Sequence, residues 1–159
     1  TYSDDSQDSF YGFGCILDTA VADDSLLNYR LNLGVELWTM AFDEEDDDLS
    51  LTKLVITNTL GFGMMREDSY RIWLGPQLRV AAGGGEFDES GDTWDQGEIG
   101  IGLAFGINFH ITKFTSLCLE GGIVAMGKWA TWDWESSTMD VYGEYSGAYL
   151  SAAILGRFE

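Results

Sequence analysis

The chain has 159 residues, the usual size of one domain, and we treat residues 1–159 as a single unit. Its 27 acidic side chains outnumber its 8 Lys and Arg and give a formal charge of −19, which excludes nucleic acid as a partner because phosphates would be repelled. Twenty glycines with one proline favour strands over helices, and no apolar run reaches the length of a membrane-spanning helix.

Seven segments alternate between apolar residues and small or polar residues with the period of two that is typical of β-strands. The clearest is 97–111, where the apolar residues from Ile99 to Ile111 alternate without a break with Gly, Ala, Asn, Glu and His. No segment has a helical period, so we expect an all-β antiparallel meander. In chain order, the predicted strands are 10–20, 27–37, 52–65, 70–82, 97–111, 116–128 and 146–158.

The fourth predicted strand contains the only proline of the chain, Pro76. Proline cannot donate to a hydrogen-bond ladder, so inside a sheet it is confined to an edge strand or to a bulge. We therefore predict a β-bulge at Gly75–Pro76.

The connections between the predicted strands alternate between short and long. Bacterial outer-membrane barrels have short periplasmic turns and longer extracellular loops. The same alternation in this chain predicts that most of its acidic residues lie in extracellular loops. The short connections are 22–25, 66–69 and 112–115, and the long ones are 42–49, 83–96 and 129–145.

Alternating strands fit either a soluble barrel with an apolar interior or a membrane barrel with an apolar exterior. The apolar face here is the bulky one, and the interior of an eight-stranded barrel is only wide enough for side chains to fill it. Gly100, Gly102 and Gly106 would weaken a strand that faces water, but on a narrow inner wall they leave room for long neighbours such as Arg30. We therefore predict an up-and-down transmembrane β-barrel with apolar side chains facing lipid, and the soluble barrel is the alternative.

Four stretches carry a family resemblance: Asn28–Leu37, Arg71–Val80, Gly97–His110 and the last strand, which ends on the aromatic Phe158. They resemble small Gram-negative outer-membrane β-barrels of the OmpA-transmembrane and OmpX type, and more loosely other bacterial outer membrane β-barrel domain proteins. Glu159 departs from the terminal assembly signal of such proteins by following the aromatic residue. The resemblance implies a bacterial outer-membrane location, contact with outer-membrane lipid and lipopolysaccharide, and insertion by the barrel-insertion machinery. It implies no activity.

Charged residues on the predicted inner faces form two layers. Unpaired charges in a narrow interior are costly, so we interpret them as ion pairs that plug the barrel, and a small selective pore is the first alternative. The 22–25 turn predicts that Asp18 lies close to Arg30, and the 112–115 turn predicts that Asn108 lies opposite Glu120. The predicted network comprises Asp18, Arg30, Arg71, Glu120 and Arg157 near the periplasmic end and Glu36, Lys53, Arg79 and Glu98 near the outer end, with His110 and Lys128 in the same two layers.

His110 is the only histidine, which excludes a histidine-based metal cluster. Some small outer-membrane barrels are lipid-modifying enzymes, and His110 with Ser116 and Glu120 would supply a catalytic set of that kind. This set lies beside a periplasmic turn, whereas an enzyme acting on the outer leaflet needs its base near the other end. We therefore predict a non-enzymatic barrel with a structural or surface-interaction role, and a lipid-modifying enzyme is the second alternative.

A run of acidic residues in the first long connection offers the carboxylate oxygens that Ca²⁺ and Mg²⁺ prefer, but it lacks the Asp-x-Asp-x-Asp-Gly spacing of an EF-hand loop. We interpret it as a solvated loop, with weak divalent cation binding as the alternative, and we expect no resident cofactor. The candidate ligands are Asp43, Glu44, Glu45, Asp46, Asp47 and Asp48.

Aromatic residues gather in the last long connection. We interpret them as part of an aromatic belt that anchors the barrel at the membrane interface, and a ligand-stacking patch is the alternative. They are Trp129, Trp132, Trp134, Tyr142 and Tyr145.

The two cysteines fall in opposite phases of their predicted strands. Cys15 shares its phase with Tyr11 and Phe13, whereas Cys118 is out of phase with the leucines on either side of it. The two thiols are therefore predicted to point to opposite faces, where no disulfide can join them. We expect both to be small buried hydrophobic residues.

An odd number of strands makes the first and the last strand run in the same direction. Bacterial single-chain barrels have even strand numbers with antiparallel neighbours throughout. We therefore expect an eighth strand in the complete barrel, supplied by an upstream segment or by a second polypeptide, with residues 138–145 as a less favoured source. Parallel closure of seven strands is the remaining possibility.

Overall fold

The structure is a computed structural model that describes residues 8–19, 26–40, 49–87, 92–134 and 137–156. Seven strands make up nearly all of this part of the chain, which confirms the predicted all-β class. Within it, no helix is long and apolar enough to cross a membrane. The strands are β1 (Asp8–Asp18), β2 (Leu27–Met40), β3 (Leu49–Arg66), β4 (Tyr70–Phe87), β5 (Thr93–Thr112), β6 (Thr115–Trp134) and β7 (Ser137–Gly156).

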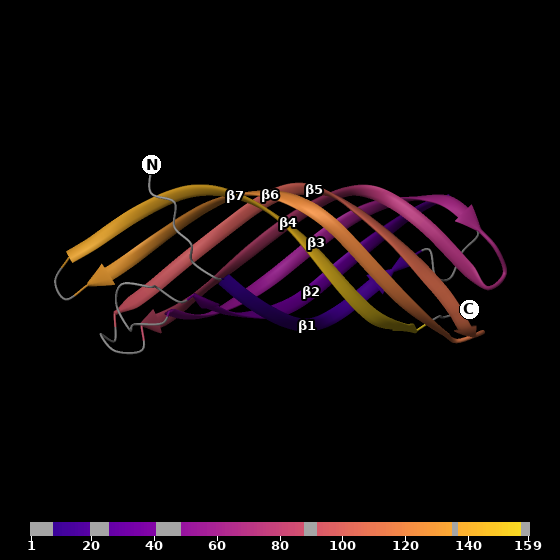
Figure 1. The fold of residues 1–159 in the computed structure, drawn as a ribbon, viewed down its shortest axis with the longest axis horizontal. Helices are drawn as coiled ribbons and strands as arrows, with labels where there is room; N and C mark the ends of the chain where they lie inside the picture. Colours follow the sequence, from indigo (N-terminus) through magenta and orange to yellow (C-terminus); the bar gives the residue numbers. More distant parts are fainter. Residues whose placement is uncertain (1–7, 20–25, 41–48, 88–91, 135–136, 157–159) are drawn as a thin grey trace.

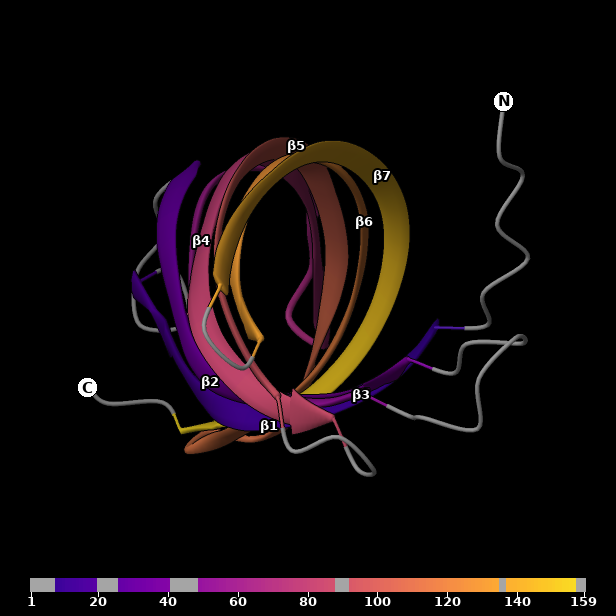
Figure 2. The same ribbon diagram turned by 90° about the vertical axis from the view of Figure 1, so that its left-hand side faces the viewer.

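The seven strands form one antiparallel sheet in which each strand pairs with its neighbours in sequence, from β1 to β7. This order confirms the predicted meander. The strands run obliquely and side by side (Figure 1), and the view from one end shows the sheet curled around a central interior (Figure 2). The curl gives the sheet an inner face and an outer face.

The two edges of the curled sheet are β1 and β7, and we call the boundary between them the seam. Cα atoms of β1 and β7 approach within 8 Å of one another. Among the described residues, no hydrogen-bond ladder joins these two strands. Because strand directions alternate and seven is odd, β1 and β7 run in the same direction. In the described residues the two edge strands are thus neighbours without a backbone ladder between them.

Strands β4 to β7 extend beyond their predicted ends, so the long connections predicted at 83–96 and 129–145 are wrong for most of their length. Strand β4 continues to Phe87 and β5 begins at Thr93, while β6 ends at Trp134 and β7 begins at Ser137. These extensions lack clean alternation, but a glycine on one strand faces a large residue on the next, as in Gly85↔Trp94 and Gly97↔Trp129. Residues 138–145 lie within β7 and supply no separate strand.

The bulge predicted at Gly75–Pro76 is wrong. Pairing of β4 with β5 continues without a register shift through Pro76, which lies opposite Leu103. Between β3 and β4, the ladder passes from Thr59↔Gln77 to Phe62↔Leu74 in the same register and shifts only between Gly63 and Met65. The missing donor of Pro76 thus coincides with an interrupted ladder, and the irregularity lies near the turn.

The register of the β5–β6 hairpin differs by two residues from the prediction. A shift between His110 and Thr112 places Asn108 opposite Cys118 and Glu120 opposite Gly106. The turn residues alone do not reveal this shift. A displacement of two residues leaves every side chain on its predicted face. By contrast, the predicted pair Asp18↔Arg30 is confirmed.

Candidate functional site: the polar interior

The inner face of the sheet carries the buried charged and polar side chains together with buried apolar ones such as Leu51 and Met126, and the outer face is apolar and exposed. Alternation along each strand explains the separation, because successive side chains point to opposite faces. Large apolar side chains such as Ile101 (70 % exposed) cover the outer face. The buried polar and charged residues, all in the inward phase of their strands, are Asn28, Arg30, Lys53, Thr57, Thr59, Arg71, Gln77, Gln96, Glu98, Asn108, Ser116 and Glu120.

Arg30 on β2 is the centre of one buried group, which we call the Arg30 cluster (Asp18, Arg30, Asn108, Cys118 and Glu120). Its guanidinium is fully buried and forms ion pairs with Asp18 at 2.5 Å and with Glu120 at 2.6 Å. It also donates to Asn108 Oδ1 at 3.2 Å and to Cys118 Sγ at 3.1 Å. One cation thus holds together carboxylates from the edge strand β1 and from β6, the neighbour of the other edge strand.

An aromatic ring covers the Arg30 guanidinium. The Arg30 Cζ atom lies 4.4 Å from the centroid of the Trp73 ring, close enough for a cation–π interaction. Trp73 faces Gly106 across the β4–β5 pair, and a methyl group at Gly106 would overlap its indole ring. Position 106 therefore accepts only glycine without a shift of the indole, because the Trp73 ring occupies the space that a side chain would take.

Tyr149 on β7 extends the Arg30 cluster towards the middle of the interior. Its hydroxyl lies 2.8 Å from Glu120 Oε1 and 2.8 Å from Gln77 Oε1, so it can donate to one of these acceptors at a time. This side chain links β7 to β4 and β6. The interior is therefore crossed by hydrogen bonds and not only lined by polar groups.

Lys53 on β3 is the centre of a second buried group nearer the other end, which we call the Lys53 cluster (Lys53, Gln96, Glu98 and Tyr145). Lys53 Nζ lies 2.6 Å from Glu98 Oε1. Gln96 Nε2 donates to the same oxygen at 2.6 Å, and the Tyr145 hydroxyl donates to Glu98 Oε2 at 2.9 Å. Both oxygens of the buried carboxylate therefore have donors.

A half-buried pair lies beside the Lys53 cluster. Arg79 Nη2 donates to Glu36 Oε2 at 2.6 Å, and the indole of Trp38 donates to the same oxygen at 3.1 Å. The Lys53 ammonium lies 3.8 Å from the centroid of that indole. Trp38 thus connects the two ion pairs of this end.

The structure brings most of the predicted network into these contacts. Asp18, Arg30 and Glu120 come together, as do Lys53 with Glu98 and Glu36 with Arg79. Arg71 is buried, and its guanidinium donates to the Leu26 carbonyl at 3.4 Å. Lys128 lies 6.0 Å from the centroid of the Trp94 ring. Arg157 lies outside the described residues.

Sequence reasoning missed several uncharged members of the interior. Trp73 and Tyr145 are missing from the predicted inner face, yet each falls in the inward phase of its strand. Phase was the signal that identifies Trp73 and Tyr145. The alternation of the last strand does place Tyr149 in the inward phase, but it does not predict the contacts of its hydroxyl with Glu120 and Gln77. For Tyr145, the predicted place in an aromatic belt is wrong, because its hydroxyl binds Glu98 inside the sheet. Trp129 and Tyr142 are exposed on the outer face, while the side chains of Trp132 and Trp134 lie outside the description.

The two thiols point to opposite faces, as predicted, and neither forms a disulfide. Cys118 is buried, but Cys15 is exposed, so its predicted burial is wrong. Cys15 shares the outer face with Tyr11 and Phe13, and on this fold the apolar face is the exposed one.

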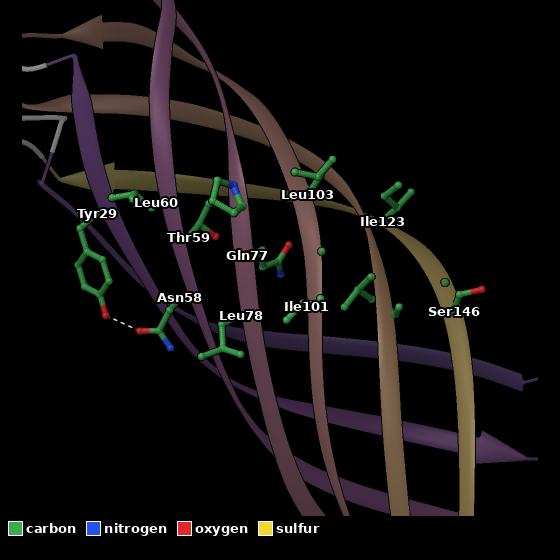
Figure 3. A pocket seen from close by; sticks show the side chains of 15 residues that line it. Tyr29, Asn58, Thr59, Leu60, Gln77, Leu78, Ile101, Leu103, Ile123 and Ser146 are labelled. Carbon is green, nitrogen blue, oxygen red and sulfur yellow. Dashed lines mark hydrogen bonds between the residues drawn. The ribbon is translucent and has the colours of Figure 1, made fainter.

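A shallow groove of about 1040 Å³ crosses the outer face at mid-height (Figure 3). Apolar side chains such as Leu78, Ile101 and Ile123 line it. At one end, the Tyr29 hydroxyl donates to Asn58 Oδ1, so a polar pair interrupts the apolar surface.

The acidic candidates for metal binding, Asp43 to Asp48, lie outside the described residues. In the described part of the chain, no group of three or more His, Cys, Asp or Glu residues could hold a metal ion.

The fold and the interior define a curled antiparallel β-meander with a charged inner face and an apolar outer face. No family model, curated protein or solved structure matches the chain. The resemblance to outer-membrane barrels of the OmpA-transmembrane and OmpX type therefore stays a prediction.

Proposed function

We propose that this chain is a non-enzymatic β-barrel of a bacterial outer membrane, with a structural or surface-interaction role and an interior blocked by ion pairs. The observation that carries the proposal is the polarity of the two faces: charges are buried inside, and large apolar side chains are exposed outside. A soluble monomer rarely exposes apolar patches of this extent.

The height of the apolar surface supports a membrane location. On β5, exposed apolar side chains run from Ile99 to Ile111. Twelve residue steps at about 3.3 Å each, tilted by about 40°, correspond to a band of roughly 30 Å. The outer apolar band of bacterial barrels is about 25 Å tall. Outer-membrane lipid and lipopolysaccharide are the partners that such a surface fits, with insertion by the barrel-insertion machinery.

The test of membrane insertion is reconstitution into lipid vesicles and detergent micelles. We expect the protein to need detergent or lipid to stay monomeric and to migrate differently on a detergent gel before and after heating. A monomer that stays soluble without detergent would contradict the membrane proposal.

The Arg30 and Lys53 clusters support a blocked interior rather than a conducting one. Each crosses the interior with side chains that are almost completely buried. Single-channel recording in planar bilayers separates the two cases. We expect no steady open level, and reproducible conductance of the wild-type protein would favour the small pore.

His110 and Ser116, the pair that a lipid-modifying enzyme would use, lie within hydrogen-bonding distance, but the serine is closed to solvent. His110 Nδ1 lies 2.9 Å from Ser116 Oγ, whereas Ser116 is fully buried. A nucleophile needs an open approach to its substrate, so this geometry favours a structural hydrogen bond. Unchanged lipid A after expression of the protein is the expected result, and a changed acyl pattern would favour the enzyme.

The proposal includes an eighth strand from an upstream segment or a second polypeptide. Unpaired backbone groups on β1 and β7 would be costly in hydrocarbon, and a strand antiparallel to both would pair with them. Intact mass and terminal sequencing of the protein isolated from outer membranes test this. A closed monomeric barrel of residues 1–159 alone would leave parallel closure as the account.

A further inference from the structure

We propose that Arg30 is a latch that holds the seam between β1 and β7 shut, so that breaking its contacts opens the side of the barrel. This inference rests on the proposed function for its surroundings, but the contacts that carry it do not depend on a membrane. No backbone ladder joins β1 to β7 in the described residues, so side-chain contacts are what connect these two edges.

The first step is that side chains bridge the two sides of the seam. Arg30 belongs to β2, next to the edge strand β1, and pairs with Asp18 of β1 at 2.5 Å. The same guanidinium pairs with Glu120 of β6, next to the other edge strand, at 2.6 Å. Since both carboxylates are fixed to their own strands, the cation between them holds the two sides together.

The second step is that apolar packing supports the same bridge. Ile16 of β1 packs against a small buried cluster formed by Cys118 of β6 and Leu155 of β7. Cys118 in turn accepts a hydrogen bond from Arg30 at 3.1 Å. The Arg30 cluster and this apolar contact therefore act at the same place on the inner side of the seam.

The third step concerns the size of the gap. A strand between β1 and β7 would need two interstrand spacings, roughly 9.6 Å in all, but Cα atoms of the two edges approach within 8 Å. At those points an added strand does not fit unless the edges move apart. The seven-stranded sheet is thus the latched state, and the eighth strand of the proposed function would enter only after Arg30 releases Glu120, with the Lys53 cluster still crossing the interior.

Spin labels on the outer face measure the opening directly. The native Cys15 on β1 is exposed, and Leu150 on β7 is 88 % exposed, so in a C118S background, which leaves no other thiol, labels on Cys15 and on L150C report the width of the seam. We expect R30Q to lengthen or broaden this distance by about one strand spacing, about 4.8 Å. The matched control is R79Q, which breaks the Glu36–Arg79 pair between β2 and β4 and leaves the seam untouched.

The buried thiol Cys118 gives an independent readout in a C15S background. We expect a maleimide to modify Cys118 at least about tenfold faster in R30Q than in the parent protein or in R79Q. Removing the cation beside the thiol would by itself slow the reaction, so a faster rate reports access.

If R30Q does not fold, E120A carries the test, since it removes the β6 half of the bridge and keeps the Arg30–Asp18 pair. Unchanged spin-label distances together with unchanged Cys118 protection would overturn the latch. Both measurements work in micelles and do not depend on insertion into a bilayer. A protein that needs no detergent would therefore refute the membrane proposal, but it would not decide whether Arg30 holds the seam shut.

Discussion

Lys53 and Arg79 each meet a carboxylate oxygen at 2.6 Å, but water reaches them to different degrees. The side chains of Lys53 and Glu98 are 1 % exposed, whereas those of Arg79 and Glu36 are 15 % and 13 % exposed. Breaking a buried pair leaves an uncompensated charge in a medium of low dielectric, while an accessible charge is partly screened by solvent.

This difference predicts unequal costs for matched substitutions. K53M is expected to lower the free energy of unfolding by about 3–5 kcal/mol because it strands the Glu98 carboxylate. R79M is expected to cost about 1 kcal/mol. Urea unfolding from micelles, followed by tryptophan fluorescence, measures both. The double variant K53M/E98Q should recover part of the loss, and equal costs for the two single variants would contradict the burial argument.

The contact between Gly106 and Trp73 predicts the cost of a single added methyl group. G106A is expected to destabilise the protein by about 1–3 kcal/mol, since the added methyl group overlaps the indole ring and the ring must move. In a W73L background the same substitution should cost much less. The coupling comes from a double-mutant cycle of unfolding free energies, and additive effects would mean that the ring is not what excludes a side chain.

At the scale of the strands, the sequence predicted seven strands and the face of nearly every side chain, because period-two alternation follows directly from the pleat. It did not predict where β4 to β7 end. Beyond the clean alternation, the ladders continue through pairs such as Gly85↔Trp94 and Gly97↔Trp129, and such pairing is a property of two strands together that neither strand shows alone. The β5–β6 register was missed for a similar reason, since the shift between His110 and Thr112 changes pairing without changing faces.

The candidate site was predictable as a set of inward charges but not as a set of contacts. Phase along each strand places Arg30, Asp18 and Glu120 on the inner face. The meeting of Arg30 with Glu120 depends on how tightly the sheet curls, which no single strand specifies. Trp73 and Tyr145 were missed because outward and inward aromatic side chains look alike in composition, and only phase along the strand separates them.

The position of a residue along its strand predicts how much an outward-facing charge there destabilises the protein in a bilayer. Ile101 lies at mid-height of β5 and Ile111 lies at its turn end, and both are exposed. In a bilayer, I101R is expected to cost about 2–4 kcal/mol and I111R about 0–1 kcal/mol. Denaturant unfolding from vesicles measures the difference. Equal, small effects at the two positions would place the surface in water.

At the scale of the whole molecule, the two ends of the sheet differ in chemistry. The connections that we predict to be acidic and extracellular follow β2 and β4, and the short turns after β3 and β5 lie at the other end. The Arg30 cluster lies nearer the short turns, and the Lys53 cluster lies nearer the acidic end.

Labelling of whole cells tests this orientation. In a C15S/C118S background, T93C at the start of β5 should react with a membrane-impermeant thiol reagent in intact cells. S69C in the exposed β3–β4 turn should react only after the outer membrane is permeabilised. The reverse pattern would mean that the barrel is inserted the other way up.

The shared direction of β1 and β7 has a topological consequence for anything attached to the sheet. Strand β1 begins at Asp8, opposite Met40, and β7 ends at Gly156, opposite Thr115, so the outermost described residues lie at opposite ends of the strands. An even meander would return both to one side. Across a bilayer, a peptide grafted ahead of Asp8 would be displayed on the cell surface, and one grafted after Gly156 would face the periplasm. The odd number of described strands thus places the two attachment points at opposite ends of the sheet.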